Sequence, residues 1–190
     1  MADNSTIPYS LLGELESIGE MELPPLHRWH PPLSGDIDIT IGRDGRWSHE
    51  GTVITRQRLV RLFSSILRRE DDGCYYLVTP AEKWRVQVED APFHCVLVDN
   101  DGQGEEQVLT FTTNVADKVV LDAEHPLRFE ISAETQQPSP YLLVRHGLEA
   151  LLARSVYYHV MELAVAEEVD AATWLGVWSG GLFFKITRDE

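Results

Sequence analysis

Arginines and carboxylates are the residues of this chain whose types and placement could do chemistry. Arg56 and Arg145 take matching positions in two similar segments, residues 54–63 and 143–152. A guanidinium donates hydrogen bonds in a rigid fork that fits a carboxylate or a phosphate, so the pair could hold an anion or a partner peptide. The candidate ligand-binding residues are Arg56, Glu82, Asp90, Arg145, Glu149 and Arg154.

Several uses of these charges remain open at this point. Exposed charges on helices are ordinarily solvated salt bridges with little effect on stability. If the six side chains converge between two repeats, they form a site for a small anionic ligand or a protein partner. A hydrolase would use Asp90 or Glu82 as a base and Arg145 as an anion clamp in a closed cleft. A purely structural interaction protein would instead expose an open apolar surface.

Familiar catalytic and metal motifs are missing from the sequence. Residues 99–104 begin like a calcium loop, but position twelve, which should be a bidentate Glu, is Thr110. The seven histidines include no H-E-x-x-H pair, and Ser179 does not stand in a G-x-S-x-G turn. No phosphate-binding glycine loop is present either. We therefore expect no metal and no cofactor.

The two similar segments predict the elements that must position these residues. Each lies between strand-like runs, which favours a unit of strands, one amphipathic helix and further strands, used twice. The first helix would carry Leu59, Leu62 and Phe63 on its buried face, and the second would start near Leu148 and continue past Val156. The fold class predicted is α+β, with two tandem repeats.

Further elements follow from local patterns. Residues 8–18 predict a short helix, and prolines around residues 26–30 predict an extended strap over residues 26–32 that cannot be helical. Alternating residues predict a hairpin over 36–49, strands between 75 and 144, and a closing hairpin over 174–186. The expected organisation is residues 1–33 as helix and strap, 34–106 as the first repeat and 107–190 as the second, with 136–140 as a candidate loop between subdomains.

Composition limits the partners. The chain has 190 residues, of which 43% are hydrophobic, so it can bury a core. A formal net charge of -15 disfavours nucleic acid and anionic membrane surfaces. No secretory signal and no apolar run long enough for a membrane span is visible, so we expect a cytoplasmic protein. Its two cysteines, Cys74 and Cys95, are expected to be reduced packing residues.

Four segments together resemble a bacterial family known as domain of unknown function 1285: residues 45–51, 79–83, 88–93 and 144–151. The similarity runs from about Trp29 to the end of the chain. The resemblance implies a duplicated α+β core and a C-terminal half similar to pleckstrin-homology domains. It also implies a binding site at the interface of the halves and a role in signal transduction. It brings no enzymatic activity, so the expected function is ligand or partner binding.

Overall fold

The computed structural model describes residues 23–131 and 138–188, which form two compact units that divide between Asp90 and Ala91. This division comes earlier than the expected boundary between residues 106 and 107. The reason is that strand β7 (Phe93–Asp101) pairs within the second sheet and so belongs to the second unit. The expected helix over residues 8–18 lies outside the described residues.

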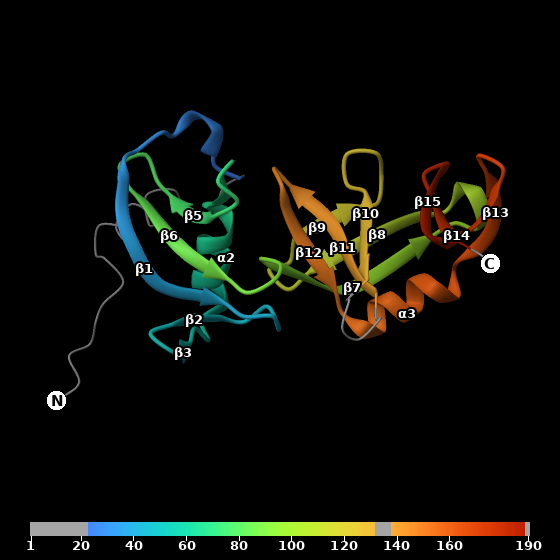
Figure 1. Cartoon of the computed structure of the whole chain (residues 1–190). Helices are drawn as coiled ribbons and strands as arrows, with labels where there is room; N and C mark the ends of the chain where they lie inside the picture. Colours follow the sequence, from blue (N-terminus) through green and yellow to red (C-terminus); the bar gives the residue numbers. More distant parts are fainter. Residues whose placement is uncertain (1–22, 132–137, 189–190) are drawn as a thin grey trace. The chain divides into compact units, whose positions relative to one another are not determined.

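The first unit is built on one six-stranded sheet (Figure 1). Its strands are β1 (Leu33–Ile41), β2 (Trp47–His49), β3 (Thr52–Val53), β4 (Leu67–Arg69), β5 (Tyr75–Val78) and β6 (Lys83–Val88). They lie in the order β3-β2-β1-β6-β5-β4. The central pair, β1 and β6, is parallel, and the other pairs are antiparallel. The expected hairpin over residues 36–49 is confirmed as β1 and β2.

The second unit repeats this topology. Its six-stranded sheet contains β7, β8 (Val108–Thr113), β9 (Lys118–Val120), β10 (Leu127–Ile131), β11 (Pro138–Arg145) and β12 (Leu148–Leu152). They lie in the order β10-β11-β12-β7-β8-β9, and again the first and last strands, β7 and β12, form the central parallel pair. Each sheet is thus two three-stranded meanders joined side by side. The topology supports the predicted duplication and the α+β class.

The segments that suggested the duplication are nevertheless not equivalent. Residues 54–63 lead into helix α2 (Gln57–Ser65), whereas residues 143–152 form the hairpin of β11 and β12. The predicted start of the second helix near Leu148 is therefore wrong. His146 and Gly147 both have positive φ angles, 43° and 76°, so they turn the chain into a tight hairpin there. Burial then alternates along β12 with the period of a strand.

Helix α2 packs on one face of the first sheet. Its buried side chains are Val60, Phe63 and Ser64, while Leu59 and Leu62, expected in the core, are half-buried. The ring of Phe63 stacks on Trp47 with centroids 6.1 Å apart. Ile37, Ile39, Ile41 and Leu77 complete this core. The opposite face of the sheet is consequently free to carry charged side chains.

The second unit places its helix differently. Helix α3 (Arg154–Glu162) follows β12 instead of separating the two meanders, and it buries Val156 and Val160. A three-stranded sheet follows, made of β13 (Val165–Val169), β14 (Ala172–Ser179) and β15 (Leu182–Arg188). It confirms the expected closing hairpin, since β14 and β15 pair through Trp178 and Phe183. The pleckstrin-homology-like barrel implied by the family resemblance stays a prediction. A short 3-10 helix, η2 (Gly104–Glu106), precedes β8.

The strap, residues 26–32, differs from its prediction in one respect. Residues Leu26–Arg28 form a single 3-10 turn, η1, in a segment that was expected to be extended throughout. The flanking prolines do not prevent this, because none of them lies inside the turn and Pro25 stands at its N-terminal cap. The strap otherwise lies beside the first sheet, where Leu26 and Trp29 contact Arg68 of β4.

Candidate functional site

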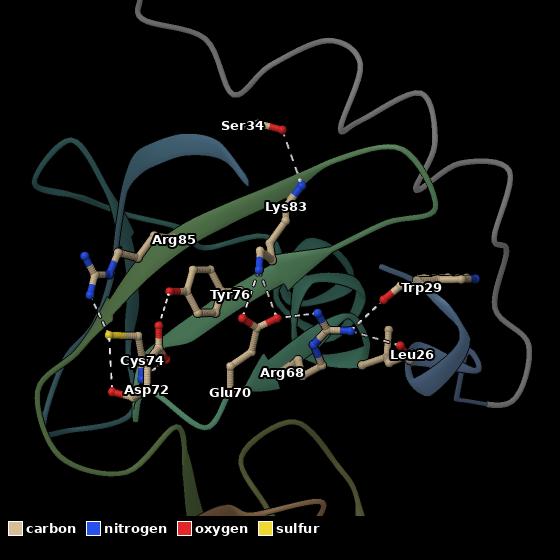
Figure 2. Close-up of polar contacts among 10 residues, drawn as sticks. All are labelled: Leu26, Trp29, Ser34, Arg68, Glu70, Asp72, Cys74, Tyr76, Lys83 and Arg85. Atoms are coloured by element: carbon tan, nitrogen blue, oxygen red, sulfur yellow. Dashed lines mark hydrogen bonds and ion pairs between the residues drawn. The ribbon is translucent and has the colours of Figure 1, made fainter. Parts of the chain in front are cut away.

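The strongest cluster of charged side chains lies in the first unit, where the strap meets the sheet (Figure 2). The Nη1 atom of Arg68 donates to the main-chain oxygens of Leu26 (3.1 Å) and Trp29 (2.8 Å), and its Nη2 atom pairs with Glu70. Lys83 Nζ donates to both oxygens of Glu70, at 3.2 and 2.9 Å. The three side chains are only 17%, 24% and 18% exposed, so water screens their pairing weakly. We call Arg68, Glu70 and Lys83 the ionic triad.

Strand pairing explains why these residues meet. In β4, β5 and β6, Arg68 lies opposite Tyr76, and Tyr76 lies opposite Arg85. Neighbours in register project to the same side of a sheet, and that side is opposite to the one bearing Leu67 and Leu77, which are buried. The triad therefore lies on the outer face of the first sheet.

A second group of polar side chains continues along the same face. Tyr76 donates its hydroxyl to Asp72 Oδ2 at 2.6 Å, and Asp72 Oδ1 accepts the main-chain N–H of Cys74 at 2.8 Å. Arg85 donates to the sulfur of Cys74. Lys83 connects the two groups, because its Nζ atom lies 4.8 Å from the centre of the Tyr76 ring. Figure 2 shows the two groups side by side.

These contacts move the pKa values of the titrating groups further from neutral pH. Burial favours a raised pKa for Glu70, but hydrogen bonds and charges from Lys83 and Arg68 outweigh it and leave the pKa lowered. The hydrogen bond from Tyr76, helped by the Cys74 N–H, lowers the pKa of Asp72. The same bond to Asp72, together with burial, raises the pKa of Tyr76 to about 12. At neutral pH both acids are ionised and the phenol is protonated.

The first three predicted site residues lie elsewhere in the first unit. Arg56 is the exposed N-cap residue of α2. Glu82 accepts a hydrogen bond from the indole Nε1 of Trp84 at 3.0 Å. Asp90 pairs with Arg43, whose Nε atom lies 3.1 Å from its Oδ2. The partners named here, Trp84 and Arg43, do not belong to the predicted set.

The other three predicted residues lie in the second unit. Arg145 is 11% exposed, pairs with Asp117 and lies over the ring of Phe93, with 4.8 Å between Cζ and the ring centre. Glu149 accepts two hydrogen bonds from Arg128, at 2.9 and 2.8 Å. Arg154 is the exposed first residue of α3, not a residue inside a longer helix. The expected convergence of the six residues between the repeats stays a prediction.

Sequence reasoning missed the ionic triad. The helical pattern of the first repeat, continued along the chain, predicts Arg68 on a charged face of the helix, but the helix ends at Ser65 and Arg68 belongs to β4. A usable signal was present: Arg68 and Glu70 are two residues apart, and Glu70 starts the turn Glu70-Asp71-Asp72-Gly73 that ends a strand as readily as a helix. Only the pairing with β5 and β6 brings Lys83 to them.

The described residues offer neither a metal-binding cluster nor a membrane-spanning helix. Within residues 23–131 and 138–188, no three His, Cys, Asp or Glu side chains lie close enough together to hold a metal ion. Neither of the described α-helices is long and apolar enough to cross a membrane.

The two cysteines are free thiols with different surroundings. Cys95 is fully buried, and burial raises its pKa to about 12, so it holds almost no thiolate at neutral pH. Cys74 is half-buried and adjoins Arg85. We expect iodoacetamide to label Cys74 in the folded protein at least ten times faster than Cys95, read by mass spectrometry of tryptic peptides. Denatured protein, in which both should react alike, is the control. Equal labelling of both thiols in the folded protein would contradict this assignment.

These observations define a two-unit α+β protein with duplicated sheet topology and a paired, partly buried ionic cluster on the outer face of its first sheet. Family models identify it further. Residues 24–91 match "Domain of unknown function (DUF1285), N-terminal domain", and residues 92–186 match "Protein of unknown function (DUF1285), C-terminal domain". The chain belongs to the DUF1285 family. The junction of the two matches falls one residue from the division between the units.

Two solved structures support the assignment. A DUF1285 family protein from Silicibacter pomeroyi DSS-3 is 45% identical, with a TM-score of 0.84 over 99% of this chain and 97% of that chain. A second, from Shewanella baltica OS155, is 31% identical, with a TM-score of 0.51 over 65% of this chain and 89% of that chain. No curated protein matches.

Proposed function

We propose that this chain is a cytoplasmic binding protein with a role in signalling, which takes a small anionic ligand or a protein partner and catalyses no reaction. The observation that carries the proposal is the protonation state of the candidate site. General acid–base catalysis needs a group whose pKa lies near the working pH. The pKa values of Glu70 and Asp72 are lowered and that of Tyr76 is raised to about 12, so at neutral pH the two acids are ionised and the phenol is protonated.

The cations of the same face favour an anion as ligand. Arg85 is exposed, and its hydrogen bond to Cys74 raises its pKa, so it remains fully charged. It presents a guanidinium fork beside the ionic triad, in a chain whose formal net charge is -15. The rival hydrolase would use Glu82 or Asp90, which are engaged with Trp84 and Arg43.

A titration with inorganic phosphate, followed by two-dimensional amide NMR, tests the proposal. We expect saturable shifts that concentrate at Cys74, Tyr76 and Arg85, and at least a tenfold weaker affinity in Arg85→Gln. Arg46→Gln is the matched control, because Arg46 is also exposed but pairs with Asp44 at the β1–β2 turn. Shifts spread evenly over the surface, or unchanged affinity in Arg85→Gln, would exclude this site.

The same protein is assayed with p-nitrophenyl phosphate and p-nitrophenyl acetate. We expect no turnover above the buffer rate. Turnover that disappears in Glu82→Gln or Asp90→Asn would establish the hydrolase instead.

A further inference from the structure

Arg68 binds the strap as a receptor binds a peptide. Its single Nη1 atom reaches two main-chain oxygens three residues apart, those of Leu26 and Trp29. These oxygens are presented by the 3-10 turn, and the contact joins residues about forty positions apart in sequence. Donors aimed at main-chain oxygens recognise the course of a peptide more than its side chains.

The receptor side of this contact is held in place without the strap. Glu70 fixes the far side of the Arg68 guanidinium, and Lys83 fixes both oxygens of Glu70. Lys83 is in turn positioned over the Tyr76 ring. All of these groups come from β4, β5, β6 and the turn after β4. A preorganised donor loses little conformational freedom when a peptide binds, so the surface stays competent for a peptide that is not covalently attached.

The strap leaves one hydrogen-bond donor of this surface without an acceptor. The Nε atom of Arg68 is buried and has no acceptor among the described residues, so one donor of the fork is unused. Pro31 and Pro32 have no N–H to donate to a strand ladder, and the hydrogen bonds within the strap belong to its single 3-10 turn. Leu23 and Leu33, on either side of the strap, are 55% and 56% exposed. The residues on both sides of the strap therefore lie at the surface, although Pro31 within it is buried.

We propose that the strap is an intramolecular peptide ligand that shields the Arg68 site, and that a peptide from a protein partner, folded into the same kind of turn, displaces it. The partner peptide presents main-chain oxygens to Arg68 as Leu26 and Trp29 do. Because the strap is tethered, its effective concentration at the site is on the order of millimolar, so it suppresses weak peptides and yields to a tighter one. Binding would then release the strap from the sheet.

This inference rests on the proposed binding function and adds its regulation. The two proposals can fail separately, since the phosphate titration tests Arg85, whereas tryptic cleavage and peptide binding test Arg68 and the strap.

Trypsin cleavage after Arg28 reports strap release, because Arg28 lies within the 3-10 turn and must leave it to enter a protease. We expect Arg68→Gln to release the fragment 1–28 at least tenfold faster than the unmodified chain, by mass spectrometry. Arg69→Gln is the matched control and should stay within twofold, since Arg69 is exposed and packs on the Tyr75 ring instead. Cleavage after Arg61 in α2 monitors the rest of the unit and should not change.

Peptide binding in trans tests the receptor directly. A fluorescent peptide of residues 23–33 is titrated into the full chain carrying Trp29→Ala, which removes a half-buried side chain from the strap and is expected to weaken its attachment. We expect at least tenfold tighter binding than to the unmodified chain, where the intact strap competes. Trp29→Ala with Arg68→Gln should lose this binding, and Trp29→Ala with Arg69→Gln should keep it.

Three outcomes would overturn the proposal. Equal release of fragment 1–28 from the unmodified chain and from Arg68→Gln would show that Arg68 does not hold the strap. Equal peptide binding with and without Arg68 would place the receptor elsewhere. Absence of peptide binding to Trp29→Ala, although Arg28 is cleaved rapidly in it, would make the strap a structural segment only. If cleavage after Arg61 also rises in Arg68→Gln, that variant has lost stability in the first unit. The comparison of fragment release between Trp29→Ala and the unmodified chain, together with peptide binding to Trp29→Ala, then tests the proposal.

Discussion

Phe63→Ala is expected to lower the free energy of unfolding of the first unit by about 3–5 kcal/mol, the usual cost of removing a buried aromatic side chain. Phe63 is 0% exposed and stacks on Trp47, so its loss leaves a cavity between α2 and the sheet. A loss of this size is a large part of the stability of an ordinary domain. Urea denaturation followed by tryptophan fluorescence measures it.

Leu62→Ala provides the control for that measurement. Leu62 precedes Phe63 in the same helix but is half-buried, so its replacement should cost clearly less. A loss for Leu62→Ala equal to that for Phe63→Ala would mean that the helix presents a different face to the sheet.

Gly176→Ala is expected to destabilise the second unit by about 2–4 kcal/mol, at or beyond the usual range for overpacking. A β-carbon at this position would lie far inside contact distance of the Phe184 main-chain oxygen and 2.5 Å from Cζ of Phe183. The Phe183 ring can rotate away, but the Phe184 oxygen belongs to the backbone of β15, so the hairpin must distort. The midpoint of thermal unfolding, followed by far-ultraviolet circular dichroism, reports the change.

A double substitution separates the two clashes. Phe183→Ala alone removes the contact of this ring with Trp178, whose ring centre lies 5.3 Å away. Combined with Gly176→Ala, it should restore only part of the loss, because the main-chain clash remains. Complete restoration would show that the ring alone limits the space at Gly176.

Many of the strands were predictable because apolar and polar residues alternate along them. Ile37, Ile39 and Ile41 alternate with polar residues, and the structure buries all three on one face of β1. The closing hairpin was predictable for the same reason, with Gly180 and Gly181 supplying the positive φ angles of its turn.

The hairpin of β11 and β12 shows where such reasoning stops. Residues 148–152 are Leu-Glu-Ala-Leu-Leu, whose apolar positions satisfy a helical stripe as well as a strand alternation. The segment becomes strand β12 because it pairs with β7 and β11, which buries Leu148, Ala150 and Leu152 together. Helical propensity is a weak preference that tertiary packing overrides.

By itself the sequence determined the family, the α+β class, most strands and the identity of the charged residues. Only the tertiary structure decided which charges meet. Arg68, Glu70 and Lys83 form one cluster because the register of β4, β5 and β6 places them on one face, next to a strap that begins some forty residues earlier. Register depends on the packing of the whole sheet against α2, and a shift of one residue would turn these side chains to the opposite face. No local pattern carries that information.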